Sequence, residues 1–282
     1  MKIERISEDS YQLGESPIWD PVDGALYFVD SLAHAVFRHD PRNGGIRRWD
    51  VALRAGGGAV LAMDDGYHAF DFETGVATPI VEPEAGRDDL CFNDGKVDRH
   101  GRFVVGSMHN GASEPLGALY RLDADLGCSS VDGNYICSNG PCWSPDGATL
   151  YVTDTYAEAI FAYDYDTATG AVDNRRMFHS IKGSDGYPDG GRVDAEGHVW
   201  SVQFGAGKIR RIAPDGAVER VIELPVQWVT SLTFGGADHD VLYVTSISGE
   251  DQGERDSSPG AGGLFAVNGL GVQGLAEPRF KG

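Results

Sequence analysis

Hydrophobic residues in this chain occur in short runs, and six such runs directly follow a polar turn. Each turn contains an acidic residue or a histidine, and five of the six contain glycine. The turns and runs are Asp23-Gly24 before ALYFVD, Asp65-Gly66 before YHAFDF, His100-Gly101 before RFVVGSM, Asp146-Gly147 before ATLYVTD, Glu196-Gly197 before HVWSVQF, and Asp238-His239-Asp240 before VLYVTS. Short β-branched and aromatic runs after turns of this kind predict β-hairpins.

The hairpins recur roughly every 35 to 50 residues, which is the repeat length typical of β-propeller blades. A blade is a small antiparallel sheet of about four strands that buries its faces by stacking on its neighbours. We therefore predict an all-β fold, a six-bladed β-propeller that uses residues 1–282 as a single domain. A β-sandwich or two smaller β domains remain alternatives, because short strands with frequent turns occur in all of these folds.

The two ends of the chain are predicted to close the ring of blades. Residues 2–6 have strand character, and the apolar segment LFAVNGLG lies between Gly263 and Phe280. Pairing of the first strand with the last blade would remove exposed sheet edges. The alternative is a frayed N-terminal tail.

Composition excludes several classes of partner. The net charge of -20 comes from 23 Lys and Arg against 43 Asp and Glu, so the surface repels phosphate backbones and anionic membranes. The sequence has no apolar signal-peptide segment and no apolar run long enough to span a bilayer. We expect a cytoplasmic protein, a monomer or weak homo-oligomer, that binds neither nucleic acid nor membrane.

The four cysteines show neither a CxxC pair nor a zinc-type spacing, which indicates reduced thiols. They are Cys91, Cys128, Cys137 and Cys142. A disulfide between Cys128 and Cys137 is the alternative.

Carboxylates and carboxamides recur where the innermost strands of the predicted blades begin. In a propeller these strand starts point into the central channel at one end, so the side chains should converge. Converging carboxylates repel one another unless a cation lies among them, which predicts a metal site in the channel. Oxygen donors favour Ca²⁺, Mg²⁺ or Mn²⁺, although Zn²⁺ and Fe²⁺ also accept them. Taken singly, each residue could be an ordinary turn residue. The residues are Glu15, Asn93, Asp94, Asn139 and Asp189.

Five sequence blocks in order resemble the senescence marker protein 30, gluconolactonase and luciferin-regenerating enzyme family. The blocks are GESPIWD, FNDGKVDRHGRFVVGSM, NGPCWSPDGATLYVTDT, PDGGRVDAEGHVW and FGGADHDVLYVTS, and together they span nearly the whole chain. The resemblance implies a six-bladed propeller that hydrolyses a sugar-derived lactone with one divalent metal ion, with Ca²⁺ first among the candidates. It places the metal ligands at Glu15, Asn139 and Asp189, and substrate-facing or water-holding positions at Asn93 and Asp94.

Two departures from the family pattern concern the substrate. The family commonly has Arg two residues before the Asn of the FNDGK block, and this chain has Cys91. Some relatives place an acid shortly after the segment that corresponds to GSM, and here Met108 is followed by His109. Because a thiol replaces five hydrogen-bond donors, we expect a preference for lactones with few hydroxyl groups. Cys91 and His109 are thus predicted substrate-binding residues.

Metal-assisted hydrolysis is the predicted mechanism, with Asp189 or Asp94 as the general base and Asp189 preferred. Cys91 is not expected to be a nucleophile, because a thiol beside acidic groups has a raised pKa. The sequence contains no GxSxG, HExxH or phosphate-loop motif. Another metal-dependent hydrolase, acting for example on phosphotriesters, and a binding propeller with a structural metal remain the alternatives.

Overall fold

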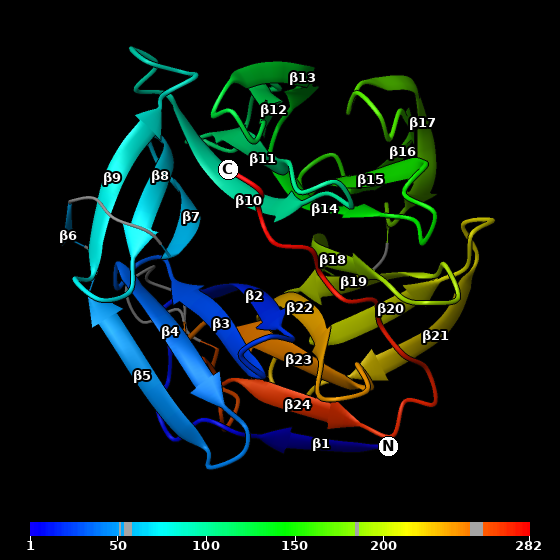
Figure 1. The fold of residues 1–282 in the computed structure, drawn as a ribbon. Helices are drawn as coiled ribbons and strands as arrows, with labels where there is room; N and C mark the ends of the chain where they lie inside the picture. Colours follow the sequence, from blue (N-terminus) through cyan, green and yellow to red (C-terminus); the bar gives the residue numbers. More distant parts are fainter. Residues whose placement is uncertain (51, 54–57, 184–185, 249–255) are drawn as a thin grey trace. The chain divides into compact units, whose positions relative to one another are not determined.

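The computed structural model describes residues 1–50, 52–53, 58–183, 186–248 and 256–282. Regular secondary structure in these ranges consists of strands, which form six sheets of four strands each (Figure 1). This is the fold class of a six-bladed β-propeller, as the hairpin repeat predicts. The chain divides into two compact units, and each contains three of the sheets. Unit 1 comprises Met1–Asp50 with Gly183–Glu277, and unit 2 comprises Val51–Lys182 with Pro278–Gly282.

Unit 1 is made of segments from both ends of the sequence. Its first sheet consists of β2 (Gly14–Asp20), β3 (Ala25–Asp30), β4 (Ala35–Asp40) and β5 (Gly45–Asp50). Its second consists of β18 (Tyr187–Val193), β19 (Val199–Phe204), β20 (Lys208–Ile212) and β21 (Val218–Glu223). Its third consists of β22 (Val229–Gly235), β23 (Val241–Ser246), β24 (Phe265–Asn268) and β1 (Lys2–Arg5).

Strand β1 completes the third sheet of unit 1. It pairs antiparallel with β24, from Lys2 opposite Asn268 to Arg5 opposite Phe265. The predicted pairing of the N-terminal strand with the last sheet is therefore confirmed, and the alternative of a frayed tail is wrong.

Unit 2 contains the other three sheets. The first consists of β6 (Ala52–Leu53), β7 (Gly58–Met63), β8 (Gly66–Asp71) and β9 (Val76–Val81). The second consists of β10 (Leu90–Val97), β11 (Phe103–His109), β12 (Gly117–Leu122) and β13 (Cys128–Tyr135). The third consists of β14 (Ser138–Trp143), β15 (Thr149–Asp154), β16 (Ala159–Tyr165) and β17 (Val172–Ser180).

The six runs predicted from the hydrophobic pattern are confirmed as the strands β3, β8, β11, β15, β19 and β23. Turn chemistry explains where they begin. Gly147, for example, has φ of 75°, a left-handed conformation that glycine adopts without a steric penalty. The four thiols are free, as predicted.

One sheet departs from the antiparallel pattern. In the first sheet of unit 2 the outermost strand is the two-residue β6, which precedes β7 in the chain and pairs parallel with β9. After β9 the chain reaches Pro83, which has no N–H to donate to a neighbouring strand. The sheet therefore receives its fourth strand from the preceding segment.

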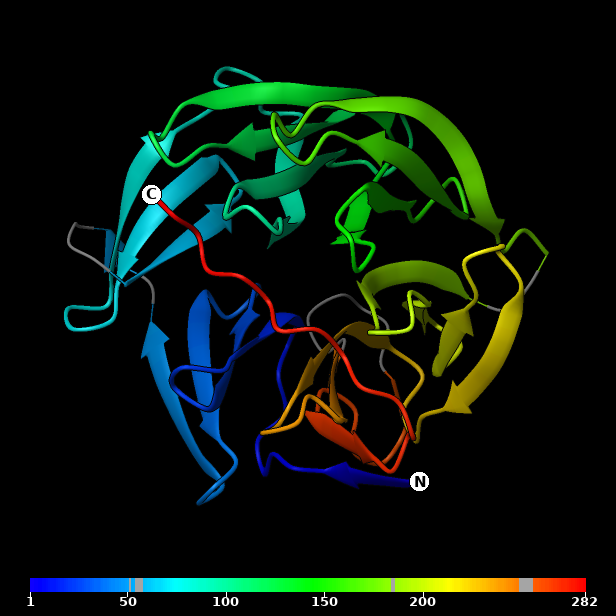
Figure 2. The ribbon, with the colours of Figure 1, turned by 45° about the vertical axis from the view of Figure 1, so that its right-hand side comes forward.

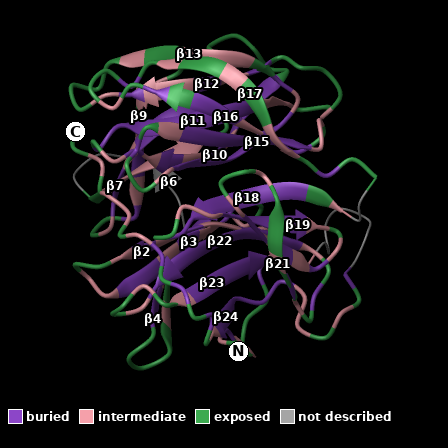
Figure 3. Cartoon of the chain, turned by 90° about the vertical axis from the view of Figure 1, so that its right-hand side faces the viewer, coloured by how far each residue is buried: buried purple, intermediate pink, exposed green. Residues whose placement is uncertain are grey.

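Burial follows the order of strands within each sheet. In unit 1, β19, β22 and β23 are almost wholly buried, whereas the outer β21 has exposed segments (Figure 3). Trp200, Phe234 and Leu242 belong to the main apolar cluster of this unit. Complete burial of such a side chain stabilises the fold by about 1.5–3 kcal/mol. The inner strands are therefore rigid supports for the residues near their ends.

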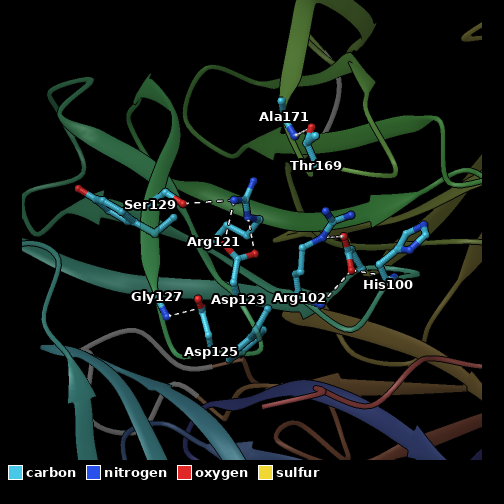
Figure 4. Close-up of polar contacts among 12 residues, drawn as sticks. His100, Arg102, Arg121, Asp123, Asp125, Gly127, Ser129, Thr169 and Ala171 are labelled. Atoms are coloured by element: carbon cyan, nitrogen blue, oxygen red, sulfur yellow. Dashed lines mark hydrogen bonds and ion pairs between the residues drawn. The ribbon is translucent and has the colours of Figure 1, made fainter.

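Buried carboxylates hold two of the hairpin turns. Asp98 Oδ1 accepts hydrogen bonds from the backbone N–H groups of His100 and Arg102, and its Oδ2 accepts one from Arg102 Nε at 2.6 Å (Figure 4). In unit 1, Asp194 Oδ1 likewise accepts hydrogen bonds from the backbone N–H groups of Glu196 and His198. The repeated Val-Asp-x-x-Gly sequence thus marks one recurring turn.

The C-terminal residues pack against unit 2. Lys281 N donates to Gly101 O at 3.1 Å, and Phe280 contacts the apolar cluster that contains Tyr67, Phe92 and Phe103 (Figure 2). A search of the described residues for a helix that is long and apolar enough to cross a membrane finds none.

Candidate functional site

The first strand of five of the six sheets contains a β-bulge. At each bulge this strand advances three residues while the facing strand advances two. The shifts run from Glu15↔Val29 to Ile18↔Tyr27, Phe92↔Ser107 to Gly95↔Val105, Asn139↔Thr153 to Cys142↔Tyr151, Pro188↔Gln203 to Gly191↔Ser201, and Val229↔Ser246 to Leu232↔Val244. Bulges re-aim side chains and are common beside active sites.

The predicted metal and base residues lie at these bulges. Glu15 and Asn139 are the last paired residues before the shift, and Asn93, Asp94 and Asp189 lie within it. Strand β7, in which the sequence offers no candidate, pairs with β8 one residue to one from Gly58 to Met63. The candidate residues therefore lie at the same kind of bulge, although Asn93, Asp94 and Asp189 come one or two residues later in it than Glu15 and Asn139.

In unit 1 the backbone beside Glu15 is strained. Ser16 N donates to Glu15 Oε2 at 3.2 Å, and Ser16 itself has φ of 47°, which is uncommon for a residue other than glycine. Asn139 of unit 2 is also followed by a left-handed residue, Gly140, with φ of 50°. Such strain costs about 1–3 kcal/mol and is typical of functional sites.

Asp189 is buried in the bulge of β18, with 8% of its surface exposed. The next residue, Gly190, packs directly on Ser231 of β22, since an added Cβ would lie 2.2 Å from Ser231 Oγ. Glycine is therefore required beside Asp189.

Sequence reasoning missed Thr230, which lies in the bulge of β22. Its Oγ1 donates to Gly14 O at 2.5 Å and lies 3.0 Å from Thr245 Oγ1. This contact joins the bulge of β22 to the residue before Glu15. Thr230 was missed because only acidic and amide residues were considered as candidates. The one sequence feature that marks Thr230 is its position before the apolar run of β22.

The two asparagines of unit 2 are held by hydrogen bonds from their amide nitrogens. Asn93 Nδ2 donates to Ser138 O at 2.9 Å, and Asn139 Nδ2 donates to Thr155 Oγ1 at 2.9 Å. The bond to a backbone carbonyl, which can only accept, fixes the nitrogen end of the Asn93 carboxamide, and the Asn139 carboxamide turns its nitrogen toward Thr155. Ser138 and Thr155 were not predicted to support the site.

Asp94 is engaged in several contacts within unit 2. Its Oδ2 accepts from Gly140 N at 3.0 Å, its Oδ1 accepts from Gly95 N at 2.7 Å, and the buried Lys96 Nζ lies 4.0 Å from Oδ2. These contacts join the bulges of β10 and β14. A carboxylate that is stabilised in its charged form in this way is a weak base.

Cys91 lines a cavity of about 460 Å³ in unit 2. Half of the other lining residues are acidic, and the full set is Asp64, Asp65, Glu82, Glu84, Ala85, Gly86, Arg87, Asp88, Leu90 and Asn110. Burial, together with the nearby Asp64 and Glu84 carboxylates, raises the pKa of the Cys91 thiol to about 11. The cavity wall at Cys91 is thus neutral.

His109 is not brought together with the asparagines. It is paired with Leu90, whereas Met108 is paired with Cys91, so the His109 side chain points to the opposite face of the sheet. Its Nδ1 lies 3.3 Å from Ser113 Oγ at the end of β11.

The donor chemistry of the candidate ligands fits a hard divalent ion. Glu15 and Asp189 offer carboxylate oxygens, and the fixed carboxamide of Asn139 offers a neutral oxygen. No group of three or more His, Cys, Asp or Glu side chains in the described ranges is placed to hold a metal ion. The predicted set contains only two such residues, because its third member is an asparagine.

Six four-stranded sheets, five of which have a bulge in their first strand, define a six-bladed β-propeller. The chain belongs to the family described as the SMP-30/Gluconolactonase/LRE-like region, whose model matches residues 13–248.

Individual relatives are similar over the full length. Regucalcin from Xenopus laevis is 36% identical over 100% of this chain and 99% of its own. A 6-deoxy-6-sulfogluconolactonase from Pseudomonas putida is 35% identical over 96% of this chain and 95% of its own. Among solved structures, a luciferin-regenerating enzyme has a TM-score of 0.90 at 29% identity, covering 99% of both chains. A calcium-binding regucalcin from Agrobacterium tumefaciens has a TM-score of 0.89 at 27% identity, covering 98% of this chain and 96% of its own.

Proposed function

We propose that this chain hydrolyses a small lactone to its hydroxy acid, with one divalent ion bound by Glu15, Asn139 and Asp189. The observation that carries the proposal is the placement of oxygen donors at, or one residue after, the start of the same kind of bulge in three different sheets. Membership of a family that includes a sulfogluconolactonase supports lactone hydrolysis. The calcium-binding regucalcin among the similar structures supports a divalent ion, with Ca²⁺ as the first candidate.

Each candidate residue has a separate role in the proposed hydrolysis. A bound ion would polarise the lactone carbonyl and stabilise the negative charge that develops on its oxygen. Asp189 takes the proton from the attacking water as general base. Asn93 holds the substrate or the water by its fixed carboxamide, since an amide cannot act as a base. Asp94 is the poorer base because Gly95, Gly140 and Lys96 already stabilise its charge.

The cavity beside Cys91 favours a neutral substrate over an anionic one. Five of its lining residues are acidic and one, Arg87, is basic, so its field repels anions. A lactone is neutral and its hydrolysis product is a carboxylate. The acidic wall therefore admits the substrate and disfavours retention of the product.

The test is release of acid from a panel of lactones, from xylono- and gluconolactone to simple γ- and δ-lactones. Protein treated with chelator is reloaded with Ca²⁺, Mn²⁺, Zn²⁺, Mg²⁺ or Fe²⁺ one at a time. We expect hydrolysis only after reloading, with higher kcat/KM on the less hydroxylated lactones.

Two variants assign the base. Asp189→Asn should lower kcat by about 10²–10⁴-fold, the usual contribution of a general base. Asp215→Asn is the control, because Asp215 is an exposed turn carboxylate that accepts from Ala217 N in the same sheet of unit 1. Full activity of Asp189→Asn would refute the role of Asp189. Inactivity of the wild type on every lactone would favour a phosphotriester hydrolase or a binding propeller.

A further inference from the structure

Three sulfur-containing residues lie on the same face of unit 2 as the two asparagines. Cys91 is paired with Met108 across β10 and β11, and Met108 forms an isolated bridge with Cys137. Residues directly opposite each other in an antiparallel pair point to the same face. Asn93 lies two residues after Cys91, and Asn139 lies two residues after Cys137, so they share this face.

Cys137 contacts both asparagines. Its Sγ lies 3.5 Å from Asn93 Nδ2 and 3.8 Å from Asn139 Nδ2, and both amides donate to it. The thiol itself donates to Met108 Sδ at 3.6 Å. Only 5% of the surface of Cys137 is exposed. The sulfur therefore has its hydrogen directed to Met108 and its lone pairs directed to the two amides.

The number of N–H groups on each carboxamide shows how the contact with Cys137 orients Asn93 and Asn139. A carboxamide nitrogen has two N–H groups. Asn93 directs one to Ser138 O and the other to Cys137, and Asn139 directs one to Thr155 Oγ1 and the other to Cys137. With both N–H groups engaged on one side, each carboxamide oxygen must face the opposite side. Cys137 is the acceptor that the two amides have in common.

We propose that Cys137 is a positioning residue that fixes the carboxamides of Asn93 and Asn139 with their oxygens turned toward ion and substrate. The proposal rests on the proposed function, in which Asn139 is an ion ligand and Asn93 holds substrate or water. A sulfur atom suits this task because its size and long hydrogen bonds let one acceptor reach two amides. Loss of the acceptor frees both amides to rotate, which weakens ion binding and substrate positioning together.

The experiment compares Cys137→Val, which has no acceptor, with Cys137→Ser, which keeps one. Cys142→Val is the matched control, because Cys142, in β14, is a buried thiol like Cys137, with 4% of its surface exposed. The first readout is the side-chain amide signals of Asn93 and Asn139 in NMR spectra. The second is the affinity for Ca²⁺ and Mn²⁺ by calorimetry, and the third is kcat and KM on the best lactone.

In Cys137→Val we expect both pairs of amide signals to shift and to lose protection from exchange. Two modest hydrogen bonds are lost, so ion affinity should fall about tenfold. Cys137→Ser should recover part of that loss, and Cys142→Val should leave the amide signals and the affinity unchanged. The kcat of Cys137→Val should fall together with the affinity, also at saturating ion.

Unchanged amide signals in Cys137→Val, or an equal loss in Cys142→Val, would overturn the proposal. If Cys137→Val does not fold, the proposal is tested by the amide signals of Cys137→Ser and of the wild type. Amide protons of Asn93 and Asn139 that exchange without protection in the wild type would also overturn the proposal. Failure of the proposed function looks different. In that case the wild type hydrolyses no lactone, while the amide signals still report whether Cys137 holds the asparagines.

Discussion

At the scale of single residues, Cys91 shows how the fold sets the reactivity of a group. Burial, together with the nearby Asp64 and Glu84 carboxylates, raises its pKa to about 11. The thiol is therefore neutral at physiological pH, and the thiolate forms only in strongly alkaline solution. Cys91 acts as a small, weakly polar wall of the cavity, in agreement with the expectation that it is not a nucleophile.

Alkylation kinetics test this protonation state. Below pH 9 iodoacetamide should modify Cys91 slowly, because only the thiolate reacts, and the rate should rise about tenfold per pH unit until the pH approaches the pKa. Mass spectrometry of the Cys91 peptide measures the rate, with Cys91→Ser as the control for assignment. In the urea-unfolded chain the alkylation rate should stop rising near the ordinary thiol pKa of about 8.5. A plateau at that pH in the folded protein would contradict the raised pKa.

Residue chemistry made part of the site predictable from the sequence. Glu15 and Asp189 were recognisable because carboxylates at the starts of apolar strands need a partner. Cys137 and Thr230 were not, because thiols and hydroxyls are common in buried strands and their contacts come from distant segments. The supporting polar groups of a site depend on register, which a single sequence does not contain.

At the scale of the strand and its turn, Asp194 supports the second sheet of unit 1. Its Oδ1 accepts from the backbone of its own turn, and its Oδ2 accepts from Trp200 Nε1 and Arg211 Nε, both at 2.8 Å. The side chains of Asp194 and Arg211, which form an ion pair, are both buried. Arg211 is also ion-paired with Glu196 and Glu219, so loss of the Asp194 charge removes a buried acceptor for Trp200 and Arg211 and does not leave Arg211 uncompensated.

Asp194→Asn should therefore lower the free energy of unfolding by about 1–3 kcal/mol. Urea unfolding monitored by tryptophan fluorescence measures the change. Asp215→Asn, at an exposed turn of the same sheet, should cost less than about 1 kcal/mol. Equal effects of the two substitutions would show that the turn hydrogen bonds, and not the buried ion pair, provide the stability.

The strands were predictable because each follows a strong turn signal, and the bulges were not. A bulge is defined by the count of residues on the facing strand, so the places of Asn93 within one bulge and of Asn139 at the start of another are known only once β11 and β15 are in register with their neighbours. The parallel pairing of β6 could not be predicted from the sequence either, because a strand of two residues shows no periodic pattern.

At the scale of the whole molecule, the six-sheet fold follows from a repeat that spans the entire chain. Each unit has its own apolar clusters, and a terminus belongs to each unit. The site was only partly accessible by the same reasoning. The repeat placed oxygen donors at equivalent positions, whereas the assignment of three of them as ligands came from the resemblance to a family.

Removal of residues 1–5 should destabilise unit 1 and promote self-association. The deletion exposes the edge of β24, which β1 pairs in the intact sheet, and an unpaired edge is a template for other chains. Thermal unfolding and light scattering should show a lower Tm and larger particles. A variant that lacks only Met1 keeps all register pairs and serves as the control. A monomeric deletion variant with unchanged Tm would show that β1 is dispensable.

The pairing of β1 with β24 also has a consequence for synthesis on the ribosome. The partner of β1 emerges about 260 residues after it, a delay of roughly 13 to 52 seconds at elongation rates of 5–20 residues per second. During that time the nascent chain carries a strand with no partner, while the segment that forms most of unit 2 is already complete. The last sheet of this protein can be completed only after β24 has left the ribosome.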